Sequence, residues 1–436
     1  MSSFGSREVS TPRFAIMKKP SAPILIALVF VFLSNASAQK REPITRPRTV
    51  TPAPAKVIAK AQVRAQEPQS APPARPAEAE KKTPTQQPTV ARENSSNRLS
   101  PNKIQQRIEE AERMLKTRPH PTALATPVID TVTVAASLPD NSHIHLFRIS
   151  KELFLTKGSE IPAISTDGLP ATIRVIRANG VNTAVTIFDE TNRSLMPLVV
   201  EYPIERGGVF REMAYYTSGH PALLSNDLTK SGQVYVNSMV DLAAKRLKDK
   251  AFPVAANVVE IAKRLCIVEH VDHDRFRNEN RIALYNEIYS LYALNELDTY
   301  RYSVSSAGAG GMVQMIPWTY NLMRQRHPGI GLNPDFVAGM RNHGNALEAM
   351  LLYMQDTWND LVANEDVMTA LSENQITPSE LMAAGYNSNA AKIPGYIRRA
   401  GGGWRYLIPR ETQIYLQIYQ SLDALTKVKA NHARTK

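Results

Sequence analysis

Cysteine is almost absent from this chain of 436 residues, which contains only Cys266. A single thiol cannot form an internal disulfide, so the fold cannot depend on one. The apolar run near the N-terminus, residues 24–33, is too short to cross a bilayer as a permanent anchor. The sequence also shows no nucleotide-binding glycine motif, no serine triad and no catalytic cysteine. These absences argue against several common enzyme classes.

The N-terminus has the pattern of an export signal. Lys18 and Lys19 precede the apolar run, and the small residues Ala36-Ser-Ala38 follow it. We therefore expect a signal peptide over residues 1–38, cleaved after Ala38, with an uncleaved membrane anchor as the alternative. No cysteine follows the apolar run closely enough for acylation as a lipoprotein. The predicted location is the periplasm or cell envelope, where the protein would be soluble after cleavage.

Residues 39–98 have the composition of a tether. They contain ten of the thirty prolines, and twelve basic residues against five acidic ones. Such a segment has too little apolar surface to fold, so we expect a disordered, extended, basic linker. Its charge would attract a polyanion such as the peptide carboxylates of peptidoglycan. The plainer alternative is a solvated linker. A nucleic-acid partner is not expected for an exported protein.

The remainder of the chain predicts a multi-domain α+β protein. Ser100, Pro101 and a helical apolar period indicate a short amphipathic helix over residues 99–118. β-Branched runs separated by turn signals predict a small β-sandwich of five to seven strands over residues 125–205, suited to binding an envelope protein. Residues 206–252 read as a connecting helical segment, and residues 253–425 as an all-α domain. A basic tail, residues 426–436, follows.

The stretch from Glu296 to Thr319 carries the strongest chemical signal. An apolar helix is predicted to run directly into Glu296, and a carboxyl group in such a position is expected to be poorly solvated. Poor solvation raises the pKa, so the group could hold a proton near neutral pH and protonate a glycosidic oxygen. The glycines that follow allow backbone to approach a bulky ligand closely.

This stretch resembles the soluble lytic transglycosylase (SLT) domain, a relative of goose-type lysozyme. With Glu296 at the catalytic position, seven further residues fall in register: Ser305, Gly308, Ala309, Gly311, Gln314, Pro317 and Thr319. Residues 385–388 (Gly-Tyr-Asn-Ser) resemble the family's Ala-Tyr-Asn-Ala, and residues 409–415 resemble its terminal Pro-x-Glu-Thr-x-x-Tyr. The resemblance covers residues 253–425.

The resemblance implies a lysozyme-like catalytic domain that acts on peptidoglycan glycan strands, as a monomer and without a cofactor or metal. Glu296 would act as acid and then as base, cleaving the bond between N-acetylmuramic acid and N-acetylglucosamine and closing a 1,6-anhydro ring. The implied substrate-binding residues are Ser305, Met312, Val313, Gln314, Tyr386 and Asn387.

Several alternatives stay open at this point. Leu297 stands where the family usually has serine, which leaves room for a muramidase that admits water. An inactive module that binds glycan strands in an envelope assembly is a further reading. Glu411 and Thr412 are expected to begin the last helix, and Trp318 would be either a sugar-stacking platform or core. His270 and His273 have zinc-ligand spacing, although a polar helix end explains them more simply.

Overall fold

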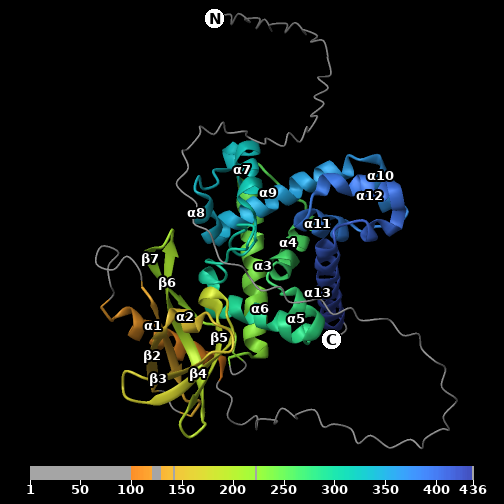
Figure 1. The fold of residues 1–436 in the computed structure, drawn as a ribbon. Coiled ribbons are helices and arrows are strands. Elements are labelled where there is room, and N and C mark those ends of the chain that lie inside the picture. The colour runs from red at the N-terminus through yellow and green to blue at the C-terminus, as the bar shows by residue number, and fades with distance from the viewer. Residues whose placement is uncertain (1–99, 120–128, 141–142, 221–222, 435–436) are drawn as a thin grey trace, which may run out of the picture. The chain divides into compact units, whose positions relative to one another are not determined.

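The computed structural model describes residues 100–119, 129–140, 143–220 and 223–434 (Figure 1). The expected signal peptide, residues 1–38, and the expected linker, residues 39–98, lie outside the described residues. What is described confirms a mixed α+β protein, with an antiparallel sheet followed by a long helical region. No helix in this described part is both long and apolar enough to cross a membrane.

The first region is built on one seven-stranded antiparallel sheet. Its strands run in the order β2-β1-β6-β5-β4-β3, and β7 pairs with β6. Their bounds are β1 Thr131–Ser137, β2 Ile144–Ser150, β3 Glu160–Ile164, β4 Pro170–Arg177, β5 Ala184–Asp189, β6 Ser194–Arg206 and β7 Val209–Tyr216. A short helix, α2 (Lys151–Phe154), follows β2. Alternate residues of β4 and β5 are buried, as expected for strands with one face on a core.

The expected sandwich of two sheets is instead a single sheet that nearly closes on itself. Strand β6 is thirteen residues long, and it pairs with β5 at its start and with β1 and β7 further along. Because β6 pairs with strands on both of its sides, the strands that were expected to form two separate sheets form one sheet. The two outer strands approach each other, and the Thr166 amide donates a hydrogen bond of 2.9 Å to the Leu146 carbonyl.

The boundary expected at residue 205 is wrong. Strand β7 lies in residues 206–252, which were expected to be helical, and extends the sheet to Tyr216. The β-branched and aromatic residues Val209, Phe210, Tyr215 and Tyr216 are the sequence feature that suits a strand here. The helix of this connecting segment is α3 (Asn226–Asp249), which occupies only the second half of it.

The amphipathic helix α1 (Pro101–Lys116) packs against the sheet. Its apolar stripe is fully buried, comprising Ile104, Ile108, Ala111 and Leu115. These side chains share a cluster with Leu146 and Leu198. Burying four apolar side chains of this kind contributes on the order of 5 kcal/mol, which explains why the helix docks here. The Ser100 side chain makes no capping hydrogen bond, although the helix begins at Pro101 as expected.

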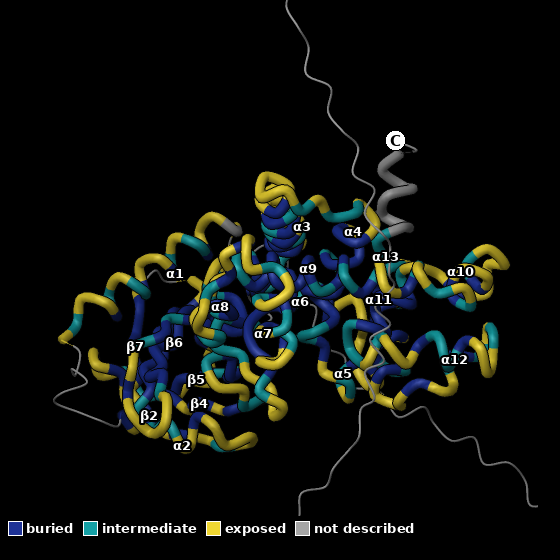
Figure 2. Tube along the Cα trace, turned by 90° about the horizontal axis from the view of Figure 1, so that it is seen from above, coloured by how far each residue is buried: buried dark blue, intermediate teal, exposed yellow. Residues whose placement is uncertain are grey.

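The helical region surrounds one continuous apolar core. After α3 its helices are α4 Ala256–Val268, α5 His273–Asn278, α6 Arg281–Asn295, α7 Pro317–Arg326, α8 Phe336–Arg341, α9 His343–Val362, α10 Glu365–Ser372, α11 Pro378–Asn387, α12 Ile393–Ala400 and α13 Arg410–Arg434. Helix α9 is central, with twelve of its twenty residues buried. In Figure 2 the buried residues gather in the middle of this region, whereas α10 and α12 consist mainly of exposed and half-buried residues.

Helix α13 crosses residue 426, where a boundary was expected. It continues to Arg434 through most of the segment that was expected to be a basic tail.

Candidate active site

A pocket of about 590 Å³ opens where segments distant in the sequence meet. It lies between the end of α4, the glycine-rich loop before α7, helix α9, the end of α11 and the start of α13. Its lining comprises Val268, Glu269, Val271, His273, Ser305, Ala307, Ala309, Gln314, Met315, Ile316, Trp318, Thr319, Tyr353, Tyr386, Asn387, Ser388, Asn389, Glu411 and Tyr415. The glycine-rich loop and both later motifs therefore converge on one site.

The glycine-rich loop is a tight turn held by Ser305. The Ser305 hydroxyl accepts a hydrogen bond of 3.0 Å from the Ala309 amide, and the two backbones also pair. Gly311 has a φ of +68°, and a Cβ there would collide with the Met340 carbonyl. Only glycine fits such a position without strain, so the turn depends on this residue.

Gln314, Tyr386 and Asn387 all line the pocket, as the resemblance implied. The Gln314 amide nitrogen donates to the Gly311 carbonyl at 2.8 Å and to the Ser303 hydroxyl at 3.2 Å. These bonds hold the side chain in place and leave its amide oxygen available to a ligand. The Tyr386 hydroxyl donates to the Val313 carbonyl at 2.7 Å, which ties α11 to the loop.

Met312 and Val313 do not line the pocket, contrary to expectation. Both residues are fully buried in the core of the helical region. Their carbonyl groups accept hydrogen bonds from within the protein, that of Met312 from His270 and that of Val313 from Tyr386. Their part in the site is therefore to anchor the surrounding side chains.

Glu296 also lies outside the pocket. It ends helix α6 with a φ of 44°, and its side chain is exposed. The expectation that this carboxyl group is poorly solvated is therefore wrong. The chain turns outward after Asn295, whose side chain bonds the backbone of Thr217 instead of prolonging an apolar helix end. The next residue, Leu297, lines a different hollow together with Arg301 and His343.

A different glutamate occupies the pocket. Glu269 follows the last residue of α4, whose buried apolar residues include Leu265, Ile267 and Val268. Its side chain is only partly exposed, and the buried Tyr415 of α13 donates a hydrogen bond of 2.5 Å to its Oε1. Burial raises the pKa of Glu269 to about 8, even though the Tyr415 hydrogen bond opposes this shift. At neutral pH this group is a carboxylic acid.

The neighbouring histidine supports the loop and is not placed to bind a metal. The His270 ring stacks on Tyr300 with centroids 3.4 Å apart, and its Nε2 donates to the Met312 carbonyl at 2.9 Å. Burial lowers the pKa of His270 to about 3, so the ring is neutral. Among the described residues, His270 and His273 do not belong to a group of three or more side chains that could hold a metal ion.

Two other lining residues frame the pocket entrance. Trp318 is 69% exposed, so it is a surface aromatic beside the pocket and not part of the core. Glu411 is an exposed carboxylate in the first turn of α13, where the positive end of the helix dipole favours it. Thr412 beside it is buried, so this motif both begins the helix and places one charge at the pocket.

Sequence reasoning did not single out Glu269, although a signal for it was present. Glu269 ends an apolar helix, which is the same argument that favoured Glu296, and it lies 36 positions before Ser305 instead of nine. Helices α5 and α6 lie between Glu269 and the glycine-rich loop in the sequence. Comparison with known proteins found no matching family model, curated protein or solved structure.

Proposed function

We propose that this pocket cleaves the glycan strands of peptidoglycan, with Glu269 as the acid and base, and that the protein is a lytic transglycosylase. The observation that carries the proposal is that the Glu269 carboxyl group, whose pKa burial raises to about 8, is held by Tyr415 in a pocket lined by Gln314 and Asn387. A carboxylic acid with a pKa near the working pH is the group that glycosidic cleavage needs.

The Tyr415 hydrogen bond distinguishes the two carboxyl oxygens of Glu269. Oε1 accepts a hydrogen bond from the Tyr415 hydroxyl, so the acidic proton of Glu269 is carried on Oε2. Oε2 then protonates the glycosidic oxygen while the bond from that oxygen to the muramyl C1 breaks. The resulting carboxylate is stabilised by the Tyr415 hydrogen bond, which strengthens as the charge forms. Tyr415 thereby assists the step in which Glu269 loses its proton.

The second step uses the same carboxylate as a base. In the resemblance, the glutamate takes the proton of the muramyl C6 hydroxyl, whose oxygen attacks C1 and closes the 1,6-anhydro ring. The substrate's acetamido group stabilises the cationic intermediate, so one carboxyl group suffices. Glu411, the other lining carboxylate, is exposed at the entrance and is not required by this scheme. Leu297, which stands where the family usually has serine, takes no part in this scheme because it does not line the pocket.

The surface beside the pocket suits a polymer. A second hollow, of about 220 Å³, shares Trp318, Tyr353 and Asn389 with the pocket. The two hollows therefore adjoin at the exposed indole of Trp318, a face on which a sugar ring can stack. A groove that continues beyond the acid is the form expected for binding several sugars of a strand.

The exported location and the envelope partners remain part of the same proposal. Peptidoglycan is reached only after export, which the N-terminal pattern predicts. The sheet region would then serve to position the catalytic region or to bind an envelope protein. The protein would act as a monomer and without a cofactor.

Mass spectrometry of the products tests the proposal. Sacculi are incubated with the wild-type protein, with Glu269→Gln and with the matched control Glu296→Gln, and the released muropeptides are weighed. Anhydro-muropeptides from the wild type and from Glu296→Gln, but not from Glu269→Gln, support the proposal. Reducing products, heavier by one water, would make the protein a muramidase. Sacculus binding without release by any of the three proteins would refute catalysis and favour a binding module.

A further inference from the structure

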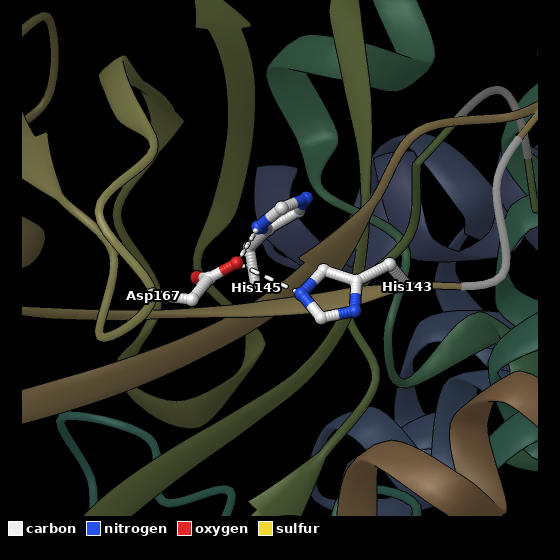
Figure 3. A group of neighbouring side chains, drawn as sticks. All are labelled: His143, His145 and Asp167. Atoms are coloured by element: carbon white, nitrogen blue, oxygen red, sulfur yellow. Dashed lines mark hydrogen bonds and ion pairs between the residues drawn. The ribbon is translucent and has the colours of Figure 1, made fainter.

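Two histidines and an aspartate meet where the sheet nearly closes. His143 directly precedes β2, His145 lies in β2, and Asp167 lies in the turn between β3 and β4. The imidazole Nε2 of His143 and Nδ1 of His145 are each 2.8 Å from Oδ2 of Asp167. Figure 3 shows both rings directed toward that one oxygen. Of the described residues, only these three form a group of this kind.

The spacing of the three ligand atoms is close to that of a metal site. All three atoms lie within 4.8 Å of one another. Tetrahedral zinc, with bonds of about 2.0–2.1 Å, holds its ligand atoms about 3.3 Å apart. Each nitrogen would therefore move about 0.5 Å away from Oδ2, and the two nitrogens would also have to lie about 3.3 Å from each other, shifts that side-chain rotation supplies. Two imidazole nitrogens and one carboxylate oxygen are a donor set that zinc accepts.

Neighbouring groups hold the aspartate in the required orientation. The Ser165 hydroxyl donates to Oδ1 of Asp167 at 2.6 Å and accepts a hydrogen bond from the Leu169 amide at 2.8 Å. One carboxylate oxygen is thus fixed by the turn, and the other is left for the two rings. Supporting hydrogen bonds to a ligating carboxylate are typical of metal sites.

We propose that His143, His145 and Asp167 bind one zinc ion, which joins β2 to the β3–β4 turn. His145 is 8% exposed, whereas the His143 side chain is 55% exposed, so one side of the site faces solvent. Water completes the fourth position there. Among the described residues, the Thr166 amide and the Leu146 carbonyl already join these two segments by a backbone hydrogen bond. The ion would add a second link where the sheet nearly closes. The proposal is independent of the chemistry at Glu269.

Calorimetric titration with zinc chloride tests the site directly. The full chain, free of any histidine tag and treated with a chelator, is titrated at pH 7.5 alongside His143→Ala, Asp167→Asn and the control Asp140→Asn. Asp140 is an exposed acid in the same β1–β2 connection. We expect one zinc per chain for the wild type and the control, and an affinity at least tenfold weaker for the two ligand variants. Magnesium should give no heat, because the site is nitrogen-rich.

Two results of the titration would refute the proposed zinc site. No zinc binding by the wild type, or binding that His143→Ala leaves unchanged, refutes the site. Circular dichroism establishes that each variant is folded, and the exposure of His143 makes its replacement the safest of the three. The joining role is tested separately by thermal unfolding, since zinc should raise the midpoint of the wild type but not of His143→Ala. Equal shifts in both proteins would refute that role.

Discussion

Replacing Glu269 with glutamine is expected to stabilise the protein at neutral pH. Burial raises the pKa of Glu269 from an ordinary value of 4.5 to about 8. The folded protein therefore binds more protons than the unfolded chain between these two pH values, and its stability falls as pH rises through that window. Keeping the group protonated at pH 7 against an unfolded value near 4.5 costs about 3 kcal/mol. Partial exposure to solvent in the pocket reduces the expected gain to about 2 kcal/mol.

Urea unfolding at pH 5 and pH 7, followed by tryptophan fluorescence, measures this effect. Trp318, Trp358 and Trp404 all lie in the helical region, so the signal reports the unfolding of the part that contains the site. The difference between Glu269→Gln and the wild type should be small at pH 5 and about 2 kcal/mol in favour of the variant at pH 7. Comparing the two proteins at each pH cancels the titration of every other group.

Glu411→Gln is the matched control, because Glu411 lines the same pocket but is exposed. Its replacement should give no stabilisation at pH 7, and a slight loss because a carboxylate favours a helix N-terminus. If Glu269→Gln behaved like Glu411→Gln, with no gain that grows with pH, the carboxyl group of Glu269 would not be held neutral. The assignment of Glu269 as the acid would then lose its physical basis.

Three further outcomes follow from the same geometry. Tyr415→Phe removes a hydrogen bond that favours the carboxylate of Glu269, so the alkaline limb of the pH–activity profile should move upward by about one pH unit. Tyr285→Phe removes a tyrosine hydroxyl that bonds another part of α13, the Ile418 carbonyl, and should leave the profile in place. Trp318→Ala should raise KM for sacculi about tenfold with little change in the free energy of unfolding, because the indole is exposed; an unchanged KM would exclude stacking. Gly311→Ala should lower the free energy of unfolding by about 2 kcal/mol or more, because the added Cβ meets the Met340 carbonyl in addition to the cost of the left-handed backbone. An unchanged free energy of unfolding in a urea titration would show that the turn is not constrained as described.

The sequence predicts the helical region and α1 well because their apolar residues recur at helical spacing. The stripe from Ile104 to Leu115 is buried as expected, and the helical assignment after residue 253 is confirmed. The sheet is less predictable, since strand alternation does not show which strands are neighbours. The long β6 pairs with three strands, a long-range arrangement that turns an expected sandwich into one curved sheet.

The candidate site, too, could be predicted only in part from the sequence. Ser305, Gln314, Tyr386 and Asn387 were named from short motifs, and the structure brings all four to one pocket. Glu296, which was named from its spacing along the chain, does not line this pocket, whereas Glu269 does. Both Glu269 and Glu296 end helices, and only the packing of α13 against the end of α4, through Tyr415, distinguishes the buried carboxyl group from the exposed one.

The most direct test of the account is the rate at which sacculi are cleared by two variants that differ only in which glutamate is replaced. We expect Glu296→Gln to clear a sacculus suspension at close to the wild-type rate, because its carboxylate is exposed and outside the pocket. Glu269→Gln should be slower by about a hundredfold or more, the usual cost of losing a general acid. Full activity in Glu269→Gln, with the loss confined to Glu296→Gln, would contradict the account.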